Sequence, residues 1–224
     1  MRSFYSQFVT SGDLCFDVGA NVGNRTRVLH SIGARVVAVE PQSACARLLR
    51  ITFGLSPRVR VLRVPLGDAE GAAEIMIASA DTLSSLSTDW IDAVVASGRF
   101  SEVRWNTREL VEVSTLDKLI RRYGVPRFIK IDVEGYEYQV LRGLSMPVPY
   151  LSFEFSPEYS RSAFDCIDRL SALGMGLFNF SHGESMRLAH RHWVGAAELK
   201  GSMSQLIDEG MDFGDVYSAA ERTA

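Results

Sequence analysis

The chain has 224 residues, enough to bury about 70% of its unfolded surface in one α/β core, so we expect a single domain. The net charge of −3 gives no global positive field to attract a polyanion, which argues against a nucleic-acid partner. Because the N-terminus has no apolar signal region and no apolar run approaches the ~18 residues of a membrane span, we expect a cytoplasmic protein without membrane contact.

The cysteine spacing also favours a cytoplasmic protein. Cys15, Cys45 and Cys166 lie far apart in apolar segments and form no Cys-x-x-Cys pair. This pattern predicts reduced thiols in the core rather than a disulfide framework or a zinc site. Near the N-terminus, Phe4, Tyr5 and Phe8 follow helical spacing; we expect them to pack on the domain, and a lid over a ligand is the alternative.

Residues 12–40 are the most informative stretch. They predict a strand over residues 14–18, a glycine turn over 19–23, a helix over 24–31 and a second strand over 35–39. This order is that of a β-α-β nucleotide-binding unit. A Rossmann-like unit that binds no ligand would have the same pattern.

The turn and the second strand carry the predicted contacts. Gly19 and Gly23 have no side chains, so backbone amides and the helix N-terminus at Asn24 can approach an anionic group of a ligand. Glu40 ends the second strand, where a carboxylate can accept hydrogen bonds from both ribose hydroxyls.

The predicted ligand is S-adenosylmethionine (SAM) rather than a dinucleotide. The spacing is Gly-x-x-x-Gly and not the Gly-x-Gly-x-x-Gly of the pyrophosphate fingerprint. Asp17 ends the first strand beside the turn, where its charge would repel a pyrophosphate and could pair with an ammonium group. SAM would place its ammonium near Asp17, its carboxylate near the helix N-terminus and its ribose on Glu40.

The next segment predicts a helix from residue 43 to 53 and an edge strand over residues 58–64, in which arginines alternate with valines. A phosphate-binding stripe is the alternative for these arginines. Asp68 then follows in a turn and either bonds the adenine amine or serves only as a turn residue. The predicted cofactor-binding residues are Asp17, Gly19, Asn21, Gly23, Asn24, Glu40, Pro41 and Asp68.

Residues 71–113 break the alternation of strands and helices. Two strands, over residues 73–78 and 108–113, predict a hairpin, and residues 79–89 predict a mobile polar loop. An insertion at the ligand edge often shapes an acceptor pocket. Trp90 and Trp105 either line that pocket or only anchor the loop.

The next predicted strand, over residues 127–135, should lie beside the first strand and carries acidic residues at its end. Ser114 is the predicted N-cap of the preceding helix. Asp132 would then fall at the topological switch point, near the transferred methyl group. Asp132, Glu134 and Glu137 could hold a positive charge, bind a divalent metal through Asp132 and Glu134, or take a proton. An acid at Glu137 is also expected from the helix dipole alone.

Two further residues complete the catalytic candidates. Glu154 lies in a predicted buried strand, so it is a base or acceptor-hydroxyl ligand, or else it forms a salt bridge with an arginine or Lys130. His182 ends a strand over residues 177–180 and has a side chain suited to proton transfer. The predicted catalytic residues are Asp132, Glu154 and His182, in that order.

The C-terminal part predicts a helix over residues 161–174 and an alternating strand over residues 187–193. A helix from residue 198 and a short strand over residues 215–217 follow, and we expect the last strand to close the sheet edge.

Together these segments resemble the FkbM-family SAM-dependent methyltransferases. The resemblance rests on Phe-Asp-Val-Gly-Ala-Asn-Val-Gly-Asn at 16–24, Val-Glu-Pro at 39–41, Ser-Ser-Leu at 84–86, Ser-Thr-Leu-Asp-Lys-Leu-Ile at 114–120 and Ile-Lys-Ile-Asp-Val-Glu-Gly-Tyr-Glu at 129–137. It implies an α/β, Rossmann-like class I methyltransferase fold with a seven-stranded, mostly parallel sheet, helices on both faces and an antiparallel last strand. It also implies O-methylation of a hydroxyl on a sugar or polyketide-like small molecule.

The resemblance divides the single domain over residues 1–224 into three parts. Residues 12–70 would form the SAM-binding half, 71–113 the insertion near the acceptor site, and 114–224 the second half. Acceptor choice is expected in residues 145–224. The alternative interpretations are an NAD-dependent oxidoreductase and a non-catalytic SAM-binding module.

Overall fold

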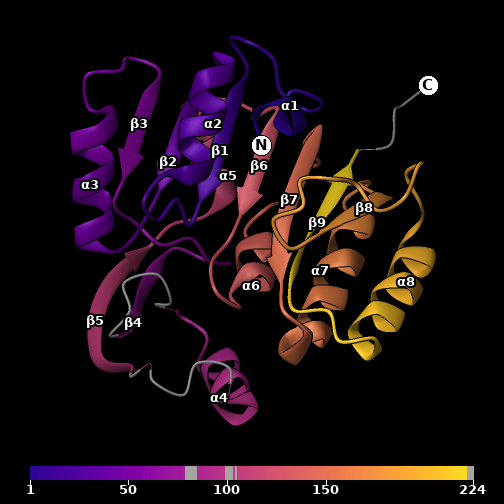
Figure 1. Cartoon of the computed structure of the whole chain (residues 1–224). Coiled ribbons are helices and arrows are strands. Elements are labelled where there is room, and N and C mark those ends of the chain that lie inside the picture. Colours follow the sequence, from indigo (N-terminus) through magenta and orange to yellow (C-terminus); the bar gives the residue numbers. More distant parts are fainter. Residues whose placement is uncertain (79–84, 99–102, 104, 221–224) are drawn as a thin grey trace.

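Within the described part of the chain, seven strands form one sheet through the middle of the molecule (Figure 1). The computed structural model describes residues 1–78, 85–98, 103 and 105–220. The strand order is β3 (Val59–Leu62), β2 (Arg35–Val39), β1 (Leu14–Val18), β6 (Phe128–Ile131), β7 (Tyr150–Phe155), β9 (Gly214–Ala219) and β8 (Leu177–His182).

The strand pairing confirms the expected sheet. β1 pairs in parallel with β2 and β6, and β6 pairs in parallel with β7. β9 is antiparallel to both β7 and β8, and it lies between them. The prediction that the last strand closes the sheet edge is therefore wrong, because β8 occupies that edge. The predicted edge position of β3 is confirmed.

Helices cover both faces of the sheet (Figure 1). α1 (Arg2–Tyr5), α2 (Asn24–Ile32) and α3 (Ser43–Phe53) pack on one face. α5 (Leu116–Tyr123), α6 (Glu137–Arg142), α7 (Ser160–Ala172) and α8 (Ala196–Asp208) pack on the other face and enclose the largest apolar cluster. No helix among the described residues is long and apolar enough to cross a bilayer.

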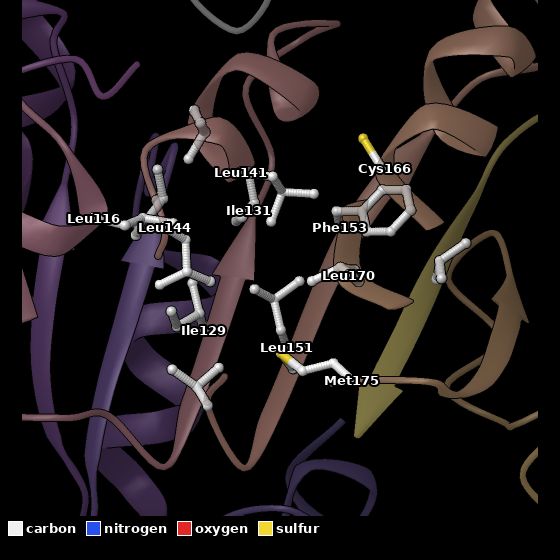
Figure 2. Close-up of a cluster of buried hydrophobic side chains, with 14 of the residues drawn as sticks. Leu116, Ile129, Ile131, Leu141, Leu144, Leu151, Phe153, Cys166, Leu170 and Met175 are labelled. Atoms are coloured by element: carbon white, nitrogen blue, oxygen red, sulfur yellow. The ribbon is translucent and has the colours of Figure 1, made fainter. Parts of the chain in front are cut away.

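The alternation of side chains along β6 and β7 separates the two faces. Ile129, Ile131, Leu151 and Phe153 are fully buried in the apolar cluster beneath α5, α6 and α7 (Figure 2). The residues between them point to the opposite face, where Lys130 and Ser152 are also fully buried.

The α1 face combines aromatic packing with a polar row. Phe4 and Phe8 contact the Tyr217 ring at centroid distances of 5.3 Å, and Tyr5 contacts Phe128 at 5.7 Å. These contacts confirm packing rather than a lid for the N-terminal segment. Nearer the carboxyl edge, the register places Asp17 opposite Lys130 and Glu154 opposite Asp215.

The insertion forms the predicted hairpin, with β4 (Gly71–Ala78) antiparallel to β5 (Trp105–Val113). Between them lies a helix that the sequence reading missed, α4 (Thr88–Ser97), capped by the Ser87 hydroxyl, which accepts a hydrogen bond from the Trp90 amide at 3.1 Å. Residues 79–84 of the predicted mobile loop lie outside the described residues. Trp90 is buried and packs edge-to-face on Trp105.

Two local predictions are wrong. Thr115, not Ser114, caps α5, because its hydroxyl accepts a hydrogen bond from the Lys118 amide at 3.2 Å. Residues 187–193 form no strand, since the Asn179 side chain bonds the His190 amide and carbonyl at 3.0 and 2.9 Å and holds them as a loop.

Candidate functional site

A cavity of about 380 Å³, here called the larger cavity, opens at the carboxyl edge of the sheet beside the turn between β1 and α2. Its walls include this turn, Glu40 to Gln42 after β2, and Pro65 and Leu66 after β3. Ile75 of β4 and Leu86 cover it from the insertion. The strand order reverses between β1 and β6, and open α/β sheets bind their ligands at such a point.

The two glycines of the turn are required by contacts within the protein. Gly19 has a φ of +79°, and a Cβ there would lie 1.6 Å from the backbone oxygen of Asp132. Gly23 has a φ of +88°, and a Cβ there would lie 2.7 Å from a Leu49 methyl group. Gly19 lines the larger cavity, whereas Gly23 lies outside its wall and provides space for α3.

Glu40 lines the larger cavity from the end of β2, together with Pro41 and the turn residues Asn21 and Asn24. Its side chain is held by the Asn21 amide and the Gln42 amide, each of which donates to a different carboxylate oxygen at 2.8 Å. Burial raises the pKa of Glu40. Because a carboxylate offers about four acceptor positions, both oxygens can accept further hydrogen bonds from a ligand.

Asp17 lies beneath the larger cavity and is not part of its wall. Its side chain is 2% exposed, and the Thr26 hydroxyl donates to its carboxylate at 2.5 Å. Burial raises the pKa of Asp17, and the Thr26 hydrogen bond opposes that shift. The predicted contact between Asp17 and a ligand ammonium therefore has no support in the cavity wall, and it stays a prediction.

Asp68 and His182 also lie outside the larger cavity. Asp68 is exposed and pairs with Arg142 at 3.3 Å, and its predicted bond to the adenine amine stays a prediction. His182 is exposed at the end of β8, which β9 separates from β7. The structure thus brings Asp132 and Glu154 together and leaves His182 apart from them.

Asp132, Glu134 and Glu154 form a carboxylate cluster at the end of β6 and β7. Each offers an oxygen within 4.8 Å of the others, and all three line the larger cavity. Lys130 of β6 precedes Asp132 by two residues and is fully buried. Its ammonium lies 3.3 Å from Asp132 and 2.7 Å from Asp215 of β9. The partners of Lys130 are thus Asp132 and Asp215.

Asp132 and Glu154 differ in their affinity for a proton. Burial alone would raise the pKa of Asp132, but Lys130 and a hydrogen bond from Glu154 lower it. Burial and the Asp132 charge hold the pKa of Glu154 well above its ordinary value. Like charges so close together do not both ionise readily, so a proton on this pair is held more readily by Glu154 than by Asp132.

A smaller cavity of about 160 Å³ lies on the other side of this cluster. Glu134 and Glu154 belong to the walls of both cavities. Five of the other twelve wall residues are aromatic, and the wall comes from α4, α6, α7, β7 and the segments next to them. Its aromatic residues are Trp90, Phe153, Phe155, Tyr159 and Phe213.

The insertion is fixed to the loop that carries the carboxylates. Ser85 donates a hydrogen bond to the backbone oxygen of Glu134 at 2.6 Å. Trp90 lies so close to Gly135 that a Cβ there would be 2.2 Å from the indole ring. Glu137 accepts amide hydrogen bonds from Val133 and Gly135, and burial raises its pKa to about 7. This geometry supports the prediction that Trp90 lines a pocket.

The sequence reading missed three charged residues at this edge, namely Arg25, Glu184 and Asp215. Arg25 of α2 pairs with Glu184, which follows β8, at 2.6 Å, and both line the larger cavity. A signal for Arg25 was present, because a cation in the first turn of a helix is disfavoured by the helix dipole. Glu184 and Asp215 gave no such signal, since only the chain topology brings them to the site.

Comparison with known proteins agrees with this geometry. The model of the methyltransferase FkbM domain family matches residues 17–173. No curated protein matches the chain in sequence.

Solved structures show the same fold at low sequence identity. One is a TehB-like SAM-dependent methyltransferase from Corynebacterium glutamicum, with a TM-score of 0.51, 10% identity, and coverage of 98% of this chain and 86% of that one. Another is fibrillarin from Aeropyrum pernix, solved with natively bound S-adenosyl-L-methionine, with a TM-score of 0.51, 12% identity, and coverage of 95% and 68%.

Proposed function

Because the chain belongs to the FkbM methyltransferase family and is a SAM-dependent methyltransferase, we propose that it methylates a hydroxyl group of a small-molecule acceptor of the sugar or polyketide type. The observation that carries the proposal is the shared wall of the two cavities, formed by Glu134 and Glu154. A methyl donor in the larger cavity and an acceptor in the smaller one would meet at these carboxylates.

The larger cavity fits SAM better than a dinucleotide. Its described walls carry five carboxylates, from Glu40, Asp132, Glu134, Glu154 and Glu184. Even with Glu154 protonated, the negative charges of the other four suit a sulfonium cation and would repel a pyrophosphate. SAM supplies an electrophilic methyl group, and Glu40 keeps free acceptor positions for the ribose hydroxyls.

The smaller cavity suits a neutral acceptor. Among its described wall residues there is no lysine, arginine or histidine, so an anionic acceptor would meet carboxylates without a compensating cation. Aromatic rings can pack against the apolar face of a sugar or a polyketide ring. The same walls favour a small molecule over a nucleic acid, because no cation is present to pair with a phosphate.

Glu154 and Asp132 can remove the hydroxyl proton of the acceptor. Glu154 would accept that proton on one oxygen while its own proton passes to Asp132, so the acceptor loses one proton and Asp132 gains one. Lys130 holds Asp132 in place from below. A positioned base of this kind contributes roughly 10²- to 10⁴-fold to the rate.

The buried Lys130 ammonium lies 3.3 Å from Asp132 and supplies positive charge to this cluster. A divalent metal on the same carboxylates would have to bind close to that ammonium, and the two positive charges would repel each other. We therefore expect methyl transfer to proceed without an added metal.

The proposal is tested with methyl-labelled SAM, small-molecule and glycan extracts of the host, and a chelator in half of the samples. We expect a labelled product whose methyl group is on oxygen, in equal yield with the chelator. The Glu154→Gln variant is the matched control, because it keeps the side-chain volume but cannot pass a proton. Label on nitrogen or carbon, or no acceptor in any extract, would contradict the proposal.

A further inference from the structure

Arg25 and Glu184 form a charged pair in the wall of the larger cavity, next to the glycine turn. Arg25 is the second residue of α2, and its side chain is 14% exposed. One terminal nitrogen donates to Glu184 at 2.6 Å, and the other lies 3.4 Å from the Met1 sulfur. The Nε atom is buried and has no hydrogen-bond partner among the described residues. The guanidinium therefore has N–H groups that donate no hydrogen bond within the described residues.

Arg25 is also the single cation in the described wall of this cavity. Burial opposes its charge, but Tyr5 and Glu184 keep the pKa of Arg25 above its ordinary value. A carboxylate on a ligand can thus find a positive partner at Arg25, and a guanidinium can bind a carboxylate through two nitrogens.

Glu184 is the carboxylate that lies beside this cation. Its side chain is 57% exposed, and its segment follows β8. Asp17, the acid expected to bind an ammonium, lies under the cavity and is held by Thr26. Asp132 is already compensated by Lys130. Glu184 is therefore the acid at this end of the cavity that has both access to the ligand and a neighbouring cation.

We propose that Arg25 and Glu184 together bind an α-amino-acid zwitterion, with the ligand carboxylate on Arg25 and the ligand ammonium on Glu184. This inference rests on the proposed function, because the zwitterion would be the methionine end of SAM. A zwitterion that enters between the two side chains replaces their contact with two new ion pairs, so neither the Arg25 guanidinium nor the Glu184 carboxylate is left without an opposite charge.

The test is a calorimetric titration of the full chain with three probes. S-Adenosylhomocysteine carries both groups of the zwitterion, decarboxylated SAM keeps the ammonium and the sulfonium but lacks the carboxylate, and 5′-methylthioadenosine lacks both the ammonium and the carboxylate. For Arg25→Met we expect the Kd of S-adenosylhomocysteine to rise roughly 10- to 100-fold, since a charge-assisted hydrogen bond is lost. The Kd values of the other two probes should not change.

For Glu184→Gln we expect weaker binding of both probes that carry the ammonium, about 3- to 30-fold, and unchanged binding of 5′-methylthioadenosine. The control is Arg108→Met, which removes an exposed arginine of β5 that pairs with Glu74 of β4, and it should change no Kd because neither residue lines the cavity. Unchanged binding of 5′-methylthioadenosine also shows that each variant is folded.

Several results would overturn the inference. Glu184→Gln could tighten S-adenosylhomocysteine binding, which would make Glu184 a competitor for Arg25. Arg25→Met could weaken all three probes equally or none of them. If the unaltered protein bound S-adenosylhomocysteine no better than 5′-methylthioadenosine, the zwitterion site would be absent while the SAM-binding fold remained. If it bound none of the probes, the proposed function itself would fail.

Discussion

Successive residues of β6 and β7 place apolar side chains on one face of the sheet and charged or polar side chains on the other face. On the α5 to α7 face, Ile129, Ile131 and Leu151 are fully buried in an apolar cluster (Figure 2). On the α1 face, Lys130 is equally buried, and Glu154 lies nearby at the carboxyl end. Burial alone therefore does not distinguish a residue that stabilises the fold from one that performs chemistry.

The difference lies in what each face gains from burial. An apolar side chain gains about 25 cal/mol for each Å² removed from water. A buried ion pair such as Lys130 and Asp215 gains little over apolar residues of the same volume, because desolvation of the two charges offsets their attraction. Such a pair is better explained by its position below Asp132 than by a contribution to stability. The following changes test this comparison.

The largest effect is expected on the charged face, at Glu154. Glu154→Gln should lower the rate of methyl transfer by roughly 10²- to 10⁴-fold, because the amide cannot relay a proton. Its free energy of unfolding should stay within about 1 kcal/mol of the original, since the Glu154 carboxyl is already neutral. Single-turnover kinetics and urea unfolding measure both quantities. A large loss of stability with an unchanged rate of methyl transfer would show that Glu154 stabilises the fold and takes no part in the reaction.

Lys130→Met should affect stability and chemistry together. We expect a loss of about 3–5 kcal/mol at pH 7, because Asp132 and Asp215 lose their buried cation. Without Lys130, the folded-state pKa of Asp215 lies above its unfolded value, so part of the stability should return as the pH falls below that folded pKa.

The double variant Lys130→Met with Asp215→Leu separates the two roles. It should recover most of the stability and none of the rate, as measured by urea unfolding and labelled transfer. Recovery of both would mean that Lys130 has no part in positioning Asp132.

Leu151→Ala tests the apolar face. It should lower the free energy of unfolding by about 2–5 kcal/mol through lost burial and a new cavity, while the rate per folded molecule stays unchanged. The adjacent change Ser152→Ala, on the other face of β7, should cost less than about 1 kcal/mol, because no hydrogen-bond partner of the Ser152 hydroxyl is found among the described residues. Equal losses from the two changes would contradict the division between faces.

The last change concerns Glu137, whose raised pKa of about 7 makes stability depend on pH. A carboxyl with a raised folded-state pKa contributes stability that is fully present below its unfolded value near 4.5 and is lost as the pH rises through 7. The loss should amount to about 3 kcal/mol at most. Glu137→Gln should flatten this part of the pH profile in urea unfolding. An unchanged slope would assign the dependence to another group.

The sequence predicted well the part of the site around the glycine turn and the end of β2, because the contacts there are local. The turn at Gly19 and the end of β2 at Glu40 follow directly from strand and helix periodicity. It placed Asp132 correctly as well, since parallel strands bring their carboxyl ends to one edge. Periodicity did not reveal that the Thr26 hydroxyl bonds the Asp17 carboxylate, and the predicted contact of Asp17 with a ligand ammonium stays a prediction.

The charged pairs of the site could not be predicted, because their partners lie far apart in the sequence. The fully buried Lys130 is compensated by Asp215, 85 residues away, and Arg25 meets Glu184 across 159 residues. No pattern within a strand or helix reveals such pairs. The helix α4 was missed because its surroundings are rich in serine and threonine, which also favour loops.

The central claim is that a SAM-shaped cavity and an acceptor cavity meet at the proton-sharing pair of Asp132 and Glu154. A crystal structure with S-adenosylhomocysteine tests it most directly. The account predicts the ribose hydroxyls on Glu40, the sulfur facing Glu134 and Glu154, and an open smaller cavity beyond them. Density for the nucleoside elsewhere, or a sulfur directed away from those carboxylates, would contradict it.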